Sequence, residues 1–98
     1  MAMSSNVQQL LARATDILPV GDEDLVYKGI AASVVERIMA LKKAVTRLQE
    51  QYDSLENLEQ TIQTEGVSPD NHTRYTDLLE WRAINYELSQ LRRLFETL

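Results

Sequence analysis

The sequence contains no cysteine, only two prolines and only three glycines among its 98 residues. The lack of cysteine excludes disulfides, thiolate metal sites and cysteine nucleophiles, and it fits a reducing compartment. The scarcity of proline and glycine removes the residues that interrupt helices and build tight turns. No apolar run approaches the ~20 residues of a membrane span, and no basic segment followed by an apolar one begins the chain. We therefore expect a soluble, cytoplasmic protein with long helices.

Basic residues and histidine are also few. Ten basic residues stand against fifteen acidic ones, and the formal net charge is −5. Non-specific attraction to nucleic acid or to an anionic membrane is therefore not expected to be the main function. His72 is the only histidine, so a transition-metal site is not expected either. The partners that remain are proteins, a second copy of the chain included.

What the sequence does contain is one long helical pattern, from about Asp22 to Glu65. No proline lies within it, and Gly66 follows as a C-terminal cap. Its apolar residues recur at intervals of three and four, as on one face of a helix: Tyr27, Ala31, Val34, Ile38, Leu41, Val45, Leu48, Tyr52, Leu55 and Ile62. The pattern predicts a single uninterrupted helix, on the order of 65 Å long, that other helices must cover.

Shorter helical patterns lie on both sides of this stretch. Residues 6–18 form an amphipathic segment that Pro19 ends, with Ser5 as its predicted cap. A third helix is predicted over residues 69–96, with Pro69 in its first turn. The connection before Pro69 is short, so this helix should fold back antiparallel. Folding the chain about Val67 places Trp81 beside Tyr52, as a layer of the core.

The third helix has two apolar stripes, and the long helix is apolar on several sides between Leu25 and Val35. One hairpin and one short helix cannot cover all of this surface, and small domains often close such gaps by oligomerising. We therefore predict an all-α fold of residues 1–98, in which the hairpin dimerises into a four-helix-type bundle. The predicted partner or dimer interface comprises Leu25, Val26, Ile30, Val34, Val35, Tyr75, Leu79, Tyr86 and Leu94.

Paired carboxylates near the hairpin tip are the one feature that suggests chemistry. Glu56 and Glu59 lie one turn apart on the long helix, and Asp77 and Glu80 lie one turn apart on the returning helix. The folding register brings the two pairs to similar heights, where carboxylate oxygens could hold Mg²⁺. The alternative is structural: Glu59 pairs with Arg74, and the other acids lie at the wet end of the hairpin.

This arrangement resembles the MazG-type nucleotide pyrophosphohydrolases, which are all-helical oligomers with paired acidic motifs on facing helices. The resemblance covers Glu56, Glu59, Asp77 and Glu80 alone. It implies a metal-dependent phosphohydrolase that binds Mg²⁺ through these carboxylates, with no other cofactor. The composition and the apolar stripes favour a different function, a small scaffold, adaptor or regulatory subunit that binds proteins, acts as a homodimer and catalyses no reaction.

Overall fold

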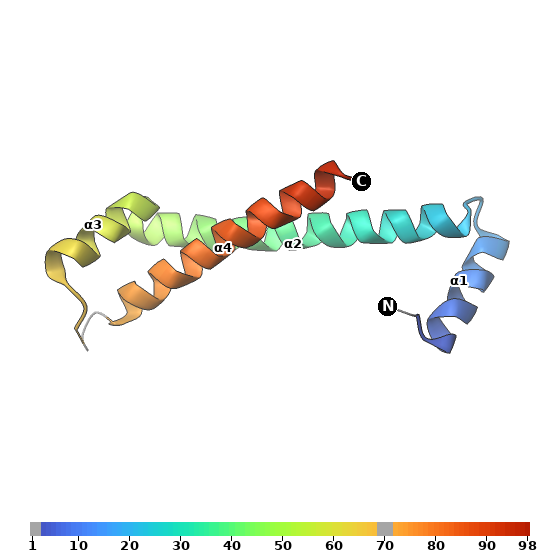
Figure 1. Ribbon diagram of the computed structural model, residues 1–98, viewed down its shortest axis with the longest axis horizontal. Helices are drawn as coiled ribbons and strands as arrows, with labels where there is room; N and C mark the ends of the chain where they lie inside the picture. The colour runs from blue at the N-terminus through green and yellow to red at the C-terminus, as the bar shows by residue number, and fades with distance from the viewer. Residues whose placement is uncertain (1–2, 69–71) are drawn as a thin grey trace.

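The computed structural model describes residues 3–68 and 72–98. These residues form four α-helices joined by short connections: α1 (Ser5–Ile17), α2 (Asp22–Tyr52), α3 (Leu55–Glu65) and α4 (His72–Glu96) (Figure 1). The described part contains no β-strand, which confirms the predicted all-α class. None of its helices is both long and apolar enough to cross a membrane. The bundle of two copies stays a prediction, since the structure contains one chain.

Helix α1 begins one residue earlier than expected, because Ser4 rather than Ser5 is its cap. The Ser4 hydroxyl accepts a hydrogen bond from the Val7 N–H at 3.2 Å, which satisfies one of the free donors of the first turn. The helix ends at Ile17, before Pro19, as the proline predicts. No residue of α1 is buried. Its apolar side therefore remains largely open in a single chain.

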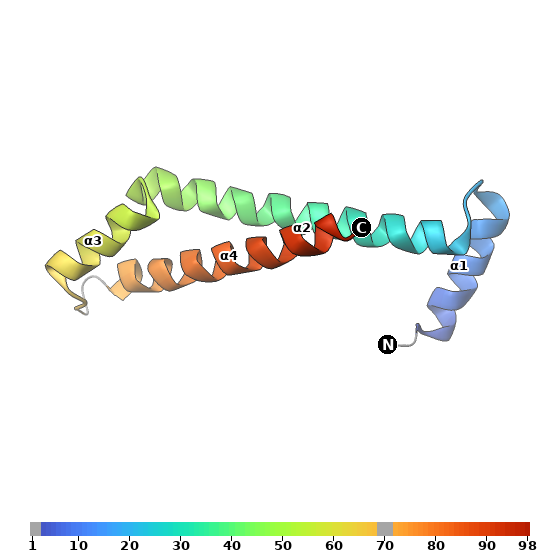
Figure 2. The same cartoon turned by 45° about the horizontal axis from the view of Figure 1, so that its top comes forward.

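The prediction of one uninterrupted helix from Asp22 to Glu65 is wrong, because the chain breaks at Asp53 and Ser54. Asp53 adopts φ 76° and ψ −63°, and the Ser54 N–H donates to the Tyr52 carbonyl at 2.9 Å. Together these form a γ-turn of the rare positive-φ kind, which is strained for any residue other than glycine. Helix α3 leaves this turn at an angle to α2 (Figure 2).

Side chains at the break satisfy the backbone groups that it frees. The Ser54 hydroxyl accepts from the Asn57 N–H at 3.0 Å, so Ser54 caps α3. The Asn57 side-chain amide donates to the Tyr52 carbonyl at 2.8 Å, which pairs one of the last acceptors of α2. Gly66 ends α3 at φ 73°, as predicted. The start of the next helix at Pro69 falls outside the described residues.

Helix α4 runs antiparallel to α2 and packs against both α2 and α3 (Figures 1 and 2). Trp81 is 3% exposed, which confirms its predicted place in the core. The buried cluster draws on all three helices and contains only apolar side chains: Leu41, Leu48, Leu58, Leu78, Trp81, Ile84 and Leu88. Tyr52, Leu55 and Ile62 pack at its edge, partly buried.

The pairing of α2 with α4 differs from the predicted register. A hairpin folded about Val67 places Arg37 opposite Thr97, whereas Arg37 pairs with Glu87 in the structure. The bend at Asp53 explains the shift, because α3 does not continue the line of α2. Fewer residues of α4 are then needed to reach a given height along α2. Arg92 and Arg93 consequently lie nearer the start of α2 than a hairpin folded about Val67 would place them.

The molecule is elongated, and part of α2 has little cover. It measures 62 × 24 × 20 Å, with a radius of gyration of 20.1 Å, whereas a compact domain of this length has about 13 Å. Its accessible surface is 7569 Å², against about 5,700 Å² for a compact monomer of this mass. Helix α4 ends partway along α2, so the first turns of α2 extend beyond it (Figure 2). We call α1 together with residues 22–35 the arm.

Candidate functional site

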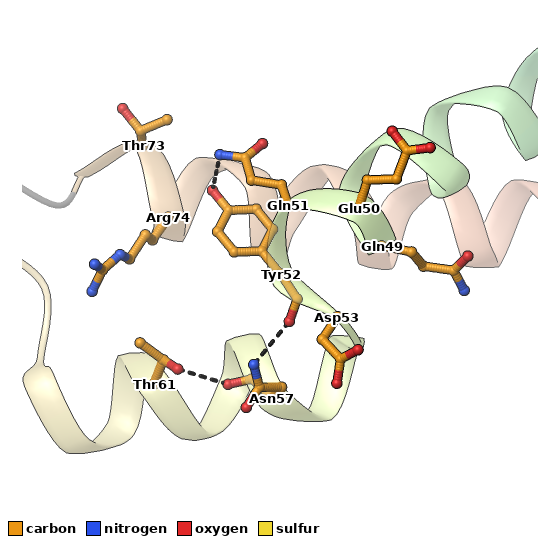
Figure 3. A pocket seen from close by; sticks show the side chains of 9 residues that line it. All are labelled: Gln49, Glu50, Gln51, Tyr52, Asp53, Asn57, Thr61, Thr73 and Arg74. Carbon is orange, nitrogen blue, oxygen red and sulfur yellow. Dashed lines mark hydrogen bonds between the residues drawn. The ribbon is translucent and has the colours of Figure 1, made fainter.

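The hairpin tip contains an open polar pocket of about 680 Å³ between the end of α2, the start of α3 and the start of α4. Figure 3 shows its lining, in which amide, hydroxyl and carboxylate side chains surround the ring of Tyr52. None of the lining residues is a histidine or a cysteine. Arg74, the only basic residue of the lining, forms an ion pair with Glu65 of α3. The pocket therefore contains hydrogen-bonding side chains, and its one positive charge, on Arg74, is already paired with Glu65.

Tyr52 connects α2 to α4 through its hydroxyl, which donates a hydrogen bond to the Asp77 carboxylate. The Gln51 side-chain amide donates to the same hydroxyl oxygen at 3.2 Å (Figure 3). Partial burial, followed by the hydrogen bond to Asp77 and its negative charge, raises the pKa of Tyr52 to about 12. Both effects favour the neutral phenol. Tyr52 therefore holds its proton and joins the two helices where the chain bends.

The four tip carboxylates do not converge as the metal hypothesis requires. Within residues 3–68 and 72–98, no three acidic or histidine side chains are grouped so that they could hold a metal ion. Glu59 pairs with Arg82 at 3.2 Å, and Glu80 pairs with Arg47 at 3.6 Å. Asp77 accepts from Tyr52, as described above, and Glu56 lies in the first turn of α3, where a negative charge is favourable. Three of the four carboxylates thus have different partners, and no two of them share one.

The structural alternative for these residues is also corrected in its details. Glu59 does not pair with Arg74, whose partner is Glu65. The bend at Asp53 rotates α3 relative to α2, which changes the side chains that face α4. The Ser54 cap and the Asn57 amide were the sequence signals for this bend, and their residue types are common at helix starts.

The predicted interface residues divide into covered and open ones. Val34 is only 5% exposed and Leu25 is half-buried, so a single chain already covers these two side chains. The others remain 39–69% exposed: Val26, Ile30, Val35, Tyr75, Leu79, Tyr86 and Leu94. Val35 points away from Val26 and Ile30, because nine residues correspond to two and a half helical turns. The open residues therefore do not form one continuous surface.

The arm contains the larger group of open apolar side chains. Of sixteen large apolar residues that are exposed in the described part, nine lie between Met3 and Val35, although the arm has only one of the eight buried core residues. A pocket of about 490 Å³ opens between α1 and the start of α2, and it is mostly apolar: Met3, Leu11, Asp22, Glu23, Val26, Tyr27 and Ile30 line it. Helix α1 thus borders an apolar surface without closing it.

A second open surface follows the side of α4 that faces away from the core. Tyr75, Leu79 and Tyr86 are separated by four and seven residues, so they share one helix face. They are 39%, 46% and 69% exposed, and Leu94 lies beside this row at 45%. The buried residues Leu78, Trp81, Ile84 and Leu88 occupy the opposite face. We call Tyr75, Leu79, Tyr86 and Leu94 the α4 stripe.

Among the charged side chains that form no ion pair in the described part of the chain, two groups lie at the ends of α2 and α4. Asp22, Glu23 and Asp24 form the acidic first turn of α2, and Arg92 and Arg93 lie near the end of α4. By contrast, four arginines nearer the hairpin are paired: Arg37 with Glu87, Arg47 with Glu80, Arg74 with Glu65 and Arg82 with Glu59. Opposite charges therefore remain unused at the arm and at the α4 terminus.

Comparison with known proteins identifies no relative: no family model, no curated protein and no solved structure matches this chain.

Proposed function

We propose that the protein is a protein–protein interaction module that binds through its exposed apolar helix faces and acts as a dimer. The observation that carries this proposal is the amount of surface left open by a single chain. The accessible area exceeds that of a compact monomer of the same mass by about 1,900 Å², and typical interfaces take about 800 Å² from each partner. Eleven of the sixteen exposed large apolar side chains of the described part lie in the arm and the α4 stripe.

The distribution of these side chains argues against ordinary surface scatter. Single exposed apolar residues are normal on soluble proteins, but contiguous apolar surfaces mark interaction sites. Tyr75, Leu79 and Tyr86 follow one helix face over about three turns, and Tyr is a residue enriched at the centres of interfaces. Two separate open surfaces allow the chain to bind a second copy through one and a different protein through the other. This is the geometry of a scaffold or adaptor.

The metal-dependent phosphohydrolase receives no support from the geometry of the tip. Within the described residues its four carboxylates form no group that could hold a metal ion, and the one cation of the tip pocket is paired with Glu65. The interaction function needs no such convergence. It requires a stable helical framework, which the apolar core supplies, and exposed side chains held in fixed positions on that framework.

Site-specific photo-crosslinking tests the α4 stripe as a binding surface for another protein. A photoreactive amino acid replaces Tyr86 in the full chain, and the protein is crosslinked in the cells that naturally express it. We expect one dominant crosslinked protein, which purified chain then binds directly. Leu79→Glu in the same chain should reduce that binding by about tenfold or more, since it places a charge in an apolar contact.

The matched control is Asn85→Asp, which adds the same charge at an exposed position of α4 that lies on a different face of the helix from Leu79. It should leave binding unchanged. If both substitutions weaken the binding equally, general charge rather than the stripe governs it. If Leu79→Glu has no effect on any captured protein, the α4 stripe is not the binding surface.

A further inference from the structure

The arm is the part of the molecule with the least internal support. Its helix α1 contains no buried residue, and Leu10 and Ile17 are 69% and 79% exposed. In α2, Val26 and Ile30 are 40% and 44% exposed on one face of the helix. A helix as short as α1 is marginal in water without tertiary contacts. Something beyond the single chain therefore has to cover this surface.

We propose that a second copy of this chain covers the arm, with the two α2 helices antiparallel about a two-fold axis near Ile30. The inference deepens the proposed function, on which it rests for the idea that exposed apolar faces are binding surfaces. It assigns the self-association to the arm and leaves the α4 stripe open. Each copy contributes the same residues to the contact, as a two-fold interface requires.

The position of the axis follows from where α4 ends. The first turns of α2 extend beyond the end of α4 (Figure 2), and Gly29 and Ile30 lie near the middle of residues 22–35, the part of α2 that belongs to the arm. An axis at this point gives the two uncovered sections their greatest overlap. A Cβ atom at Gly29 would meet no atom within 4 Å, so the backbone of a second helix can approach closely here. The face that meets the axis contains Val26, Ile30 and Ser33, spaced as one side of a helix.

The unused charges agree with this orientation. In an antiparallel pair, the first turn of α2 from one copy lies beside the last turns of α4 from the other. Asp22 and Glu23 then approach Arg92 and Arg93 of the second copy. A parallel pair would place each acidic turn beside its own counterpart, and like charges repel. None of these four side chains forms an ion pair within the described part of one chain.

The available area is sufficient for a stable dimer. The single chain exposes about 1,900 Å² more than a compact monomer of its mass, and a stable interface takes about 800 Å² from each partner. The arm contains seven of the sixteen exposed large apolar residues of the described chain, and two more, Met3 and Leu18, directly flank α1, so this region can supply a large share of this area. The same approach covers α1, because α1 borders Val26 and Ile30 across the arm pocket.

Sedimentation of the full chain over a range of concentrations tests the proposal. We expect a particle of twice the 11.2 kDa chain mass. Ile30→Glu should raise the dimer dissociation constant by about 100-fold or more, because two charges enter one apolar contact. The matched control, Leu79→Glu on the α4 stripe, should remain dimeric. Circular dichroism of both variants checks that their helices are retained.

A charge exchange tests the orientation of the two copies. Asp22→Lys with Glu23→Lys should weaken the dimer, and so should Arg92→Glu with Arg93→Glu. All four substitutions in one chain should restore it, because the pairs are then merely reversed. A parallel dimer gives no such restoration, and its absence would refute the antiparallel arrangement.

The absence of native cysteine allows a direct test of the axis. A chain with Ile30→Cys as its only cysteine should form a disulfide-linked dimer on mild oxidation, since a residue on a two-fold axis meets its own copy. Thr46→Cys, exposed farther along α2, should not. The reverse result would refute an axis near Ile30.

The results separate this inference from the proposed function. A chain that is monomeric at all concentrations but binds another protein through Leu79 refutes the arm dimer and leaves the proposed function intact. A dimer that Ile30→Glu dissociates, with no protein bound at the α4 stripe, supports the arm dimer and removes the second binding surface. A dimer that only Leu79→Glu dissociates refutes the assignment to the arm.

Discussion

The phenol of Tyr52 should make the stability of the hairpin sensitive to alkaline pH. Its hydroxyl donates to the Asp77 carboxylate across the α2–α4 contact, and its pKa is raised to about 12. An unfolded tyrosine has a pKa of about 10. Below pH 10 both states keep the proton, so the stabilisation by the neutral phenol is fully present. Between these two values the unfolded state loses its proton first, and the stabilisation falls as pH rises.

The size of the effect follows from the shift and from the exposure of the ring. Two pKa units correspond to about 2.7 kcal/mol at most. Tyr52 is only partly buried, so solvent screens part of that energy. We expect wild-type protein to lose about 1–2 kcal/mol of unfolding free energy relative to Tyr52→Phe between about pH 9 and 12. At neutral pH the phenylalanine variant should be the less stable by about 1–2 kcal/mol, since its Asp77 lacks the hydrogen bond.

Urea denaturation at a fixed protein concentration measures both quantities. The difference between wild type and Tyr52→Phe, plotted against pH, isolates this phenol from the other alkaline titrations. Tyr86→Phe is the matched control, because the Tyr86 side chain is 69% exposed and should give a curve parallel to that of wild type. If the Tyr52→Phe curve is also parallel to wild type up to about pH 12, the hydrogen bond to Asp77 does not hold the proton.

Three further predictions concern the core, the bend and the tip. Leu58→Ala should cost about 2–5 kcal/mol in urea denaturation, since Leu58 is 1% exposed, whereas a loss as small as that of Leu79→Ala would contradict its burial. Asp53→Gly should raise the free energy of unfolding by up to about 1 kcal/mol, because it relieves a positive φ. Ser54→Ala should lower it by about 1 kcal/mol through the lost cap. If both substitutions change the free energy of unfolding in the same direction, the γ-turn is refuted. Millimolar Mg²⁺ should leave the melting temperature unchanged in calorimetry, and a clear rise in that temperature would support a metal site at the tip.

Much of the helical framework could be predicted from the sequence because it depends on local signals. Pro19 and Gly66 mark helix ends by their own backbone preferences, and α1 and α3 end near them. The interval of three and four residues identified the side chains of the core, and Leu41, Leu48 and Trp81 are buried as it predicts. These signals act within a few turns, so they do not depend on the distant parts of the chain.

The bend at Asp53 could not be predicted in the same way. Asp53 and Ser54 are polar residues at an exposed point of an otherwise regular helical pattern, and such residues also occur within helices. The γ-turn forms because the Asn57 amide and the Ser54 hydroxyl pair with backbone groups on both sides of it. The same error affected the prediction for the tip, since Glu59, Asp77 and Glu80, which converge in a straight hairpin, have separate partners in the bent one.

The composition of the buried cluster gives the protein its own optical reporter. Trp81 is the only tryptophan of the chain, and it lies at 3% exposure among aliphatic residues of α2, α3 and α4. The arm contributes no residue to that cluster, so the fluorescence of Trp81 changes when the hairpin opens and does not respond to changes in the arm. Fluorescence and sedimentation on one sample can therefore show whether folding of the hairpin precedes the meeting of two copies.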